Sequence, residues 1–254
     1  MKWRIKKIAI DLAVIMSAII LSLTMDSKSK LIMNNMNEET PIFSVDTQEK
    51  VVSLTFDVNW AEKENLGSIL EILNKYNIKG TFFVMGGWIN YSQENVDKLK
   101  SISEGGHEIG NHSYKHPSFT KITFEKMKEE LQKTDDTIEQ YTGKKPTLFR
   151  FPSGDYNRDS LNKVRSLGYT CIQWDVDSVD WKEQGADVEY NKIMKKIKPG
   201  SILLFHNNAK YTPGNLERII PELKKQGYSF KPVGEIIYTS DYSVDAEGIQ
   251  HKNH

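Results

Sequence analysis

The chain has 254 residues, 38% hydrophobic and 27% charged, which supplies enough apolar material for one sizeable core and favours a single main domain. Lys plus Arg and Asp plus Glu both number 34, so the net charge gives no argument for a nucleic acid or an acidic polymer as partner. Cys171 is the only cysteine, which excludes an intramolecular disulfide and a thiolate zinc cluster. We expect Cys171 to be a small buried hydrophobe.

The N-terminus has the pattern of a membrane anchor. Four basic residues within the first seven positions precede a mostly apolar run from Ile8 to Met25, about 27 Å long as an α-helix. This length is marginal for a bilayer span, and Asp11 inside the run is expected to be interfacial. The serines on either side of Lys28 form only a weak cleavage signal, so residues 1–25 are predicted to be an uncleaved signal anchor. The protein would then be a single-pass membrane protein with its main domain outside the cytoplasm, or a secreted protein if the signal is cleaved.

The rest of the chain divides into three predicted segments. Residues 26–41 are polar and rich in Asn, Lys and Glu, which is typical of a short flexible linker. Residues 42–240 carry regular strand and helix patterns and are predicted to form the main domain. Residues 241–254 are predicted to be a disordered tail.

Within the main domain, short runs of β-forming residues alternate with segments of helical period. The predicted strands are residues 51–57, 81–86, 107–111, 147–151, 169–175, 201–206 and 229–233. Between the strands, apolar residues spaced along one face predict amphipathic helices, for example from Leu66 to Leu73 and from Phe124 to Ile138. This alternation predicts an α/β fold with a parallel sheet, and in a β/α barrel the C-terminal ends of the strands hold the active site.

Two histidines directly follow the predicted strand at residues 107–111. His112 and His116 form an H-x-x-x-H pair, and on one helical turn this spacing would point both imidazoles the same way, as two ligands of a zinc-like ion. An isolated pair is more often a pair of surface or capping histidines. Its position at a strand end, directly before Pro117, favours a functional site here.

Other residues with chemical potential also lie at or just beyond predicted strand ends. Asp57 ends an apolar run, where a carboxylate is either a site residue or the N-cap of the next helix. Arg150 and Asp177 are open to simpler explanations, as part of an exposed ion pair and as a loop carboxylate. His206 closes an unbroken apolar strand, where an imidazole is well placed to act as a general acid or base.

These residues lie in five ordered motifs that resemble those of the polysaccharide deacetylases, carbohydrate esterase family four. The motifs are TFDVNW (residues 55–60), GHEIGNHSYKHP (106–117), RFPSGDYN (150–157), WDVDSVDW (174–181) and ILLFH (202–206). The resemblance covers about residues 51–238 and implies an irregular, TIM-like (β/α)7 barrel. Within the family, the chain looks most similar to the sporulation-type and cell-wall peptidoglycan deacetylases.

The resemblance implies a catalytic role for four residues. Asp57 would be the general base, and Arg150 would hold it in its ionised form. His206 would be the general acid, oriented by Asp177, which would raise the pKa of the imidazole. The backbone N–H near Ser153 would help to stabilise the oxyanion, and Leu204 and Trp181 would line the acetyl pocket.

The resemblance also implies a divalent metal ion held by His112 and His116. Zinc is the expected metal, with cobalt or manganese as alternatives. The family motif has a second, metal-binding aspartate at the position where this chain has Val58, which cannot coordinate a metal. Metal affinity should therefore be lower unless Asn59, Asp57 or water completes the site.

The predicted function is metal-dependent hydrolysis of N-acetyl groups from amino sugars of an extracytoplasmic polysaccharide, with peptidoglycan as the favoured polymer. A metal-activated water would attack the acetyl carbonyl with help from the base and the acid. The alternative, motivated by Val58, is a catalytically impaired glycan-binding or wall-assembly module of the same fold. A small-molecule amide hydrolase is a third hypothesis. Three tryptophans near predicted strand ends either stack on sugars or pack in the core: Trp60, Trp88 and Trp181. The protein is expected to be a monomer.

Overall fold

The computed structural model describes residues 39–253. The predicted anchor at residues 1–25 and nearly all of the predicted linker lie outside the described residues. Within the described part of the chain, none of the helices combines the length and the hydropathy that crossing a bilayer requires.

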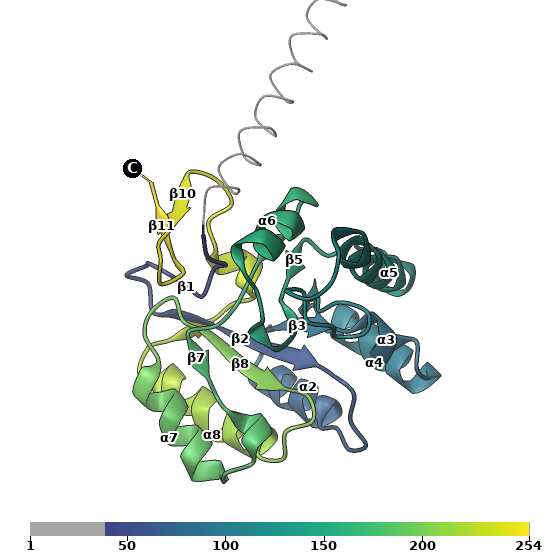
Figure 1. The fold of residues 1–254 in the computed structure, drawn as a ribbon. Helices are drawn as coiled ribbons and strands as arrows, with labels where there is room; N and C mark the ends of the chain where they lie inside the picture. The colour runs from purple at the N-terminus through teal and green to yellow at the C-terminus, as the bar shows by residue number, and fades with distance from the viewer. Residues whose placement is uncertain (1–38, 254) are drawn as a thin grey trace, which may run out of the picture. The chain divides into compact units, whose positions relative to one another are not determined.

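The centre of the fold is a curled sheet in which all strand pairs are parallel (Figure 1). The strands in spatial order are β6 (Thr170–Cys171), β5 (Leu148–Phe149), β4 (Glu108–Asn111), β3 (Thr81–Val84), β2 (Val51–Val58), β8 (Ile202–His206) and β7 (Val176–Asp177), and β9 (Ser229–Phe230) also pairs with β2. The hydrogen-bonded order ends at β6 and β7. The N-terminal segment forms single bridges beside β6 and β8, from Ile42 to Ile172 and from Ser44 to Ser201. The predicted α/β fold with a parallel sheet is therefore confirmed, and the sheet is curled like half a barrel.

All seven strands predicted from the sequence are present, although most are shorter than expected. The structure adds β7, which has only two residues and is too short for its periodicity to be read from the sequence. Strand β2 has one apolar face and one mostly polar face, with residues that alternate between the two. Val52, Leu54, Phe56 and Val58 pack in the main hydrophobic cluster.

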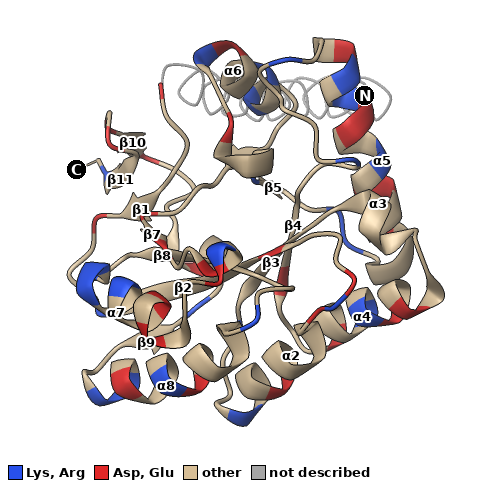
Figure 2. Ribbon diagram, turned by 60° about the horizontal axis from the view of Figure 1, so that its bottom comes forward, with Lys and Arg blue, Asp and Glu red and all other residues tan. Residues whose placement is uncertain are grey.

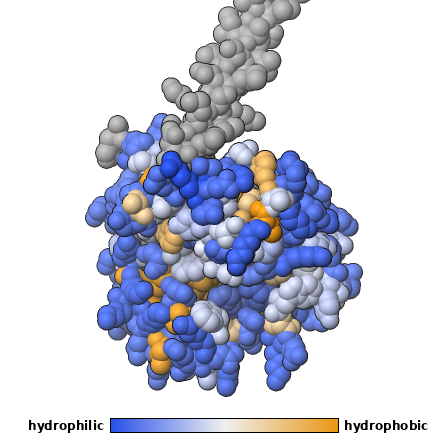
Figure 3. Space-filling model, viewed as in Figure 1, coloured by the Kyte–Doolittle hydropathy of each residue, from blue (hydrophilic) through white to orange (hydrophobic). Residues whose placement is uncertain are grey.

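Helices surround the sheet (Figure 1), and Lys, Arg, Asp and Glu lie mainly on these helices and the loops (Figure 2). The helices are α2 (Leu66–Lys75), α3 (Gly86–Ile89), α4 (Gln93–Glu104), α5 (Phe124–Thr142), α6 (Arg158–Ser166), α7 (Ala186–Lys196), α8 (Thr212–Lys225) and α9 (Val233–Ile236). Two short 3-10 turns, Pro152–Gly154 and Asp180–Lys182, follow β5 and β7. The face in Figure 3 is largely hydrophilic, with small, separate hydrophobic spots. Cys171 is buried, as predicted.

The predicted disordered tail is wrong for residues 241–253, which form part of a second, three-stranded sheet. In this sheet β11 (Ile249–Lys252) lies between β1 (Ser44–Val45) and β10 (Tyr242–Val244). The buried Gln250 side chain bonds both the backbone N–H and the carbonyl of Tyr238, at 2.9 and 2.7 Å. Gly248 has a φ of 79°, and a Cβ there would meet the Phe43 ring at 2.3 Å. These contacts join segments far apart in sequence, so no local pattern announces them.

Candidate active site

The predicted site residues meet at the C-terminal ends of the parallel strands. A cavity of about 400 Å³ opens there, lined by Asp57, Asn59, His116, Ser153, Trp174, Asp177, Trp181, Leu204 and His206. His112 and Arg150 are buried and both contact Asp57. The fold therefore gathers all nine residues singled out from the sequence at one place.

Asp57 and Arg150 form a buried ion pair on one side of the cavity. Arg150 Nη1 donates to Asp57 Oδ1 at 2.9 Å and to Thr55 Oγ1 at 2.8 Å, and Nη2 donates to the Gln173 carbonyl at 3.0 Å. The guanidinium also lies over the Phe83 ring, 4.1 Å from its centroid. Arg150 is thus fully buried and fixed from several sides, which excludes the simpler explanation as an exposed ion pair.

The pair sets the protonation state of the carboxylate. Burial alone would raise the pKa of Asp57, but the charges of His112, Arg150 and His206 and the hydrogen bond from Arg150 lower it by more. The pKa of Asp57 therefore lies below its ordinary value, so the group is an ionised carboxylate at neutral pH. In this form it can act as a general base.

His206, the register partner of Asp57 on the neighbouring strand β8, lines the same cavity and pairs with the buried Asp180. His206 Nδ1 lies 2.7 Å from Asp180 Oδ1, while Asp180 Oδ2 accepts bonds from the His206 backbone N–H at 2.8 Å and from Thr212 Oγ1 at 2.7 Å. Burial alone would lower the pKa of His206, but the hydrogen bond and the charge of Asp180 outweigh it, so the pKa is raised. The imidazole is held so that Nε2 can donate a proton.

The prediction that Asp177 orients His206 is wrong, because Asp180 makes that hydrogen bond, although the charge of Asp177 does contribute to the raised pKa of His206. Asp177 lines the cavity, but its carboxylate accepts the Val179 backbone N–H at 2.7 Å. Val179 has a φ of 53°, and the turn that begins there places the Asp180 carboxylate next to His206 in β8. The motif WDVDSVDW contains three aspartates close together, and no local pattern distinguishes the one that contacts His206.

The segment between His112 and His116 is not the predicted helical turn. Residues 112–116 are irregular, and Ser113 and His116 have positive φ angles of 66° and 59°. The two rings nevertheless come together, with centroids 4.9 Å apart. Pairing of the imidazoles was therefore correctly expected, although for the wrong local reason.

The contacts of His112 suit a metal ligand. Its Nδ1 lies 3.0 Å from the Arg150 carbonyl, so that Nδ1 carries the proton and Nε2 keeps its lone pair. Burial lowers the pKa of His112 to about 4, which keeps the ring neutral. Nε2 is buried without a hydrogen-bond partner and lies 3.5 Å from Asp57 Oδ2.

The rest of a metal shell is less complete. Among the described residues, no group of three or more His, Cys, Asp or Glu side chains is arranged to hold a metal ion. Val58 is fully buried in the apolar cluster. The buried Oδ1 atom of Asn59, which lines the cavity, has no hydrogen-bond partner. The residues thus fit a site with two imidazoles and a neutral amide oxygen, which carries less negative charge than one with a carboxylate.

Asn207 is a site residue that the sequence analysis missed. Its fully buried side chain accepts the Asn59 backbone N–H at 3.0 Å and donates to the Asn59 carbonyl at 3.2 Å, and its own backbone N–H bonds the Asp57 carbonyl at 3.2 Å. Asn207 therefore fixes the loop that follows β2. It directly follows His206, and this position at a strand end was the available signal.

The three tryptophans considered for sugar stacking differ in burial. Trp88 is only 2% exposed and belongs to the core, whereas Trp60 and Trp181 are 43% and 58% exposed. Trp181 lines the cavity, and Trp60 packs edge-on against Tyr91 with ring centroids 4.8 Å apart. Of these three, Trp60 and Trp181 can therefore offer a face to a sugar.

Comparison with known proteins gives consistent matches. The family model "Polysaccharide deacetylase" matches residues 44–172. The uncharacterized protein YlxY of Bacillus subtilis is 34% identical over 197 residues, which cover 78% of this chain and 60% of YlxY. PdaA of Bacillus subtilis, a peptidoglycan-N-acetylmuramic acid deacetylase, is 33% identical over 214 residues, which cover 82% of this chain and 80% of PdaA.

Solved structures show the same fold. The structure of Bacillus subtilis PdaA, a family 4 carbohydrate esterase, matches with a TM-score of 0.72 and 31% identity, over 83% of this chain and 88% of PdaA. A pseudoenzyme of that family from Bacillus anthracis matches with a TM-score of 0.73 and 35% identity, over 85% of this chain and 74% of its own. On this combination of sequence and structural matches, the chain belongs to the polysaccharide deacetylase family.

Proposed function

We propose that this protein removes N-acetyl groups from amino sugars of a peptidoglycan-type polysaccharide in a metal-dependent reaction. One observation carries the proposal: a carboxylate with a lowered pKa and an imidazole with a raised pKa, each with its own buried partner, face the same cavity. Amide hydrolysis needs both groups, because water must lose a proton and the departing amine must gain one.

Asp57 and His206 divide these proton transfers. Asp57 takes a proton from the water that attacks the acetyl carbonyl carbon. His206, in its imidazolium form, donates the Nε2 proton to the sugar nitrogen as the carbon–nitrogen bond breaks, which yields acetate and a free amine. The raised pKa of His206 keeps it protonated near neutral pH.

Other residues of the cavity would hold the metal and the substrate. His112, His116 and Asn59 would bind a divalent ion, expected to be zinc, which when bound would polarise the acetyl carbonyl. Leu204 and Trp181 line the cavity on the apolar side, where an acetyl methyl group would be shielded from water.

Acetate release tests the proposal directly. The full chain is incubated with peptidoglycan or chitooligosaccharides after chelation, and then with zinc, cobalt or manganese restored. We expect metal-dependent acetate release that is lost in His206→Ala. Unchanged release in His206→Ala would remove His206 from the mechanism, and release that persists after chelation would remove the metal.

A second candidate function is a glycan-binding module with little or no turnover. It is favoured by the burial of Val58 in the apolar cluster, which leaves Asp57 as the one carboxylate that the described residues place beside His112. A family member of similar fold is described as a pseudoenzyme. Binding of glycan without acetate release under any added metal would select this function, and metal-restored turnover would eliminate it.

The location of the protein is part of the same proposal. The basic and apolar pattern of residues 1–25 supports a domain held at the outer face of the cell membrane, where wall glycan is available. Membrane fractionation of the full chain and of a variant lacking residues 1–25 tests this. Recovery of both proteins in the cytosol would contradict it.

A further inference from the structure

Residues 112–116 form a backbone segment whose amides are all hydrogen bonded. The bonds run from His112 N to Val84 O (3.1 Å), Ser113 N to Asn111 Oδ1 (2.8 Å), Tyr114 N and Lys115 N to Glu130 Oε2 (3.0 and 2.7 Å), and His116 N to Ser113 Oγ (3.0 Å). Most of these acceptors are side chains or belong to another element. The positive φ angles of Ser113 and His116 are unfavourable by themselves, so the surrounding groups must maintain this conformation.

Glu130, on helix α5, holds the middle of this segment. It is fully buried, and one carboxylate oxygen accepts the two successive amides of Tyr114 and Lys115, which lie between the histidines. A buried carboxylate is costly unless its charge is compensated by such hydrogen bonds. Its other oxygen lies 3.3 Å from Lys126 Nζ, at the edge of the helix. Glu130 does not line the cavity of the candidate active site.

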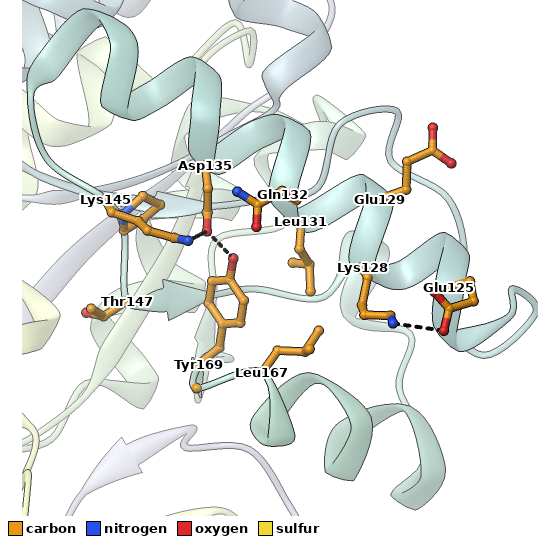
Figure 4. A pocket seen from close by; sticks show the side chains of 12 residues that line it. Glu125, Lys128, Glu129, Leu131, Gln132, Asp135, Lys145, Thr147, Leu167 and Tyr169 are labelled. Atoms are coloured by element: carbon orange, nitrogen blue, oxygen red, sulfur yellow. Dashed lines mark hydrogen bonds and ion pairs between the residues drawn. The ribbon is translucent and has the colours of Figure 1, made fainter.

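Asp135, on the same helix, holds the start of the segment through Asn111. Its Oδ1 accepts Asn111 Nδ2 at 2.7 Å, which orients the Asn111 carboxamide so that Oδ1 receives the Ser113 amide. Figure 4 shows the outer end of this series of hydrogen bonds, where Asp135 contacts Tyr169 and Lys145 beside a second cavity. The Tyr169 hydroxyl donates to Asp135 Oδ2 at 2.5 Å. Asp135 is therefore fixed from both sides.

The carbonyl side of the segment is held equally closely. The backbone amides of Gly86 and Gly87, at the start of α3, donate to the Ser113 and Tyr114 carbonyls at 3.0 and 2.9 Å. A Cβ on Gly87 would lie 2.6 Å from the Tyr114 oxygen, so this approach requires glycine. The histidine segment is thus enclosed between α3 and α5.

We propose that Glu130 and Asp135 are positioning residues that set the placement of His112 and His116 beside Asp57. They do so through the backbone of residues 112–116 and without touching substrate or metal. The role of the histidines as ligands rests on the proposed function, but the effect of the two carboxylates on the segment does not.

The test compares four variants of the full chain, one of which, Asp135→Ala, removes the acceptor of the Asn111 side chain. Glu130→Leu removes the acceptor at similar size, Glu130→Gln keeps an acceptor oxygen, and Glu129→Ala changes the exposed neighbour on the same helix. Hydrogen exchange of peptides covering residues 112–116 and 51–58 is followed by mass spectrometry, and cobalt(II) affinity by absorption titration.

In Glu130→Leu we expect residues 112–116 to exchange roughly tenfold faster or more, while residues 51–58 keep their protection. Cobalt(II) affinity should fall about 10- to 100-fold. Glu130→Gln should recover most of both, because its amide oxygen can accept the same N–H groups, and Glu129→Ala should match the parent. Asp135→Ala should give a smaller effect, concentrated at the Ser113 amide.

Two results would overturn the proposal. One is unchanged exchange of residues 112–116 in Glu130→Leu, and the other is equal acceleration in both peptides, which would make Glu130 merely a core residue. The exchange measurement needs neither turnover nor a metal. A protein that releases no acetate would therefore contradict the proposed function and still give a clear answer here.

Discussion

The two halves of the candidate site differ in whether the protein itself supplies contact partners for the functional side chains. In the acid–base half, Asp57 and His206 each have a buried partner of opposite charge at 2.9 and 2.7 Å. In the metal half, Nε2 of His112 has no hydrogen-bond partner, and Val58 packs among apolar side chains. The protein therefore supplies the partners of Asp57 and His206 itself, whereas His112 Nε2 can gain a partner only from a bound ligand.

Loss of Arg150 should have the largest effect on stability. Arg150→Met leaves Asp57 as a buried carboxylate without its cation, and the free energy of unfolding should fall by about 3–5 kcal/mol. Urea denaturation measures this. Arg158→Met is the matched control, because Arg158 pairs with Glu39 on the surface, and it should change stability by about 0–1 kcal/mol. Similar losses in both variants would show that the Asp57 pair is not special.

Asp180 and Asp177 should differ in their effect on turnover. Asp180→Asn removes the charge that raises the pKa of His206, and acetate release should fall about 100-fold or more. The alkaline limb of the pH profile should also move to lower pH, because His206 then loses its proton sooner. Asp177→Asn should cost about tenfold or less. The reverse order would restore the assignment made from the sequence.

A carboxylate at position 58 tests the incomplete metal half. Val58→Asp places a charge in the apolar cluster, and in chelator the free energy of unfolding should fall by about 2–3 kcal/mol. Zinc should recover part of this loss, because the polysaccharide deacetylase motif has a metal-binding aspartate at this position. Val52→Asp, on the same face of β2 and equally buried, should lose stability without recovery by zinc. Equal zinc responses would place residue 58 outside the metal site.

The smallest predicted effect is on the pH dependence of stability. The lowered pKa of Asp57 stabilises the fold above the unfolded value of about 4, and this contribution disappears as the pH falls through the folded pKa. The raised pKa of His206 stabilises the fold below the unfolded value of about 6.5, and this contribution disappears as the pH rises through the folded pKa. Chemical denaturation of His206→Asn between pH 6 and 9 should show the second slope flattened. An unchanged slope would contradict the raised pKa.

The sequence alone located seven strands of the central sheet and predicted that the candidate site residues gather at the strand ends. The apolar runs before Asp57 and before His206 are local signals, and parallel strands bring their C-terminal ends to one edge. The positions of Asp57, Arg150 and His206 at strand ends therefore predict that the three residues lie close together.

Only the tertiary structure decided the choices that depend on contacts between distant segments. Asp180 replaces Asp177 because of a turn at Val179, and the histidine segment is irregular because α5 and α3 hold it from outside. The last strands form because β1 and Tyr238 supply partners from elsewhere in the chain. Local periodicity reports which face of an element is buried, but the partner of a polar group is fixed only when separate elements meet.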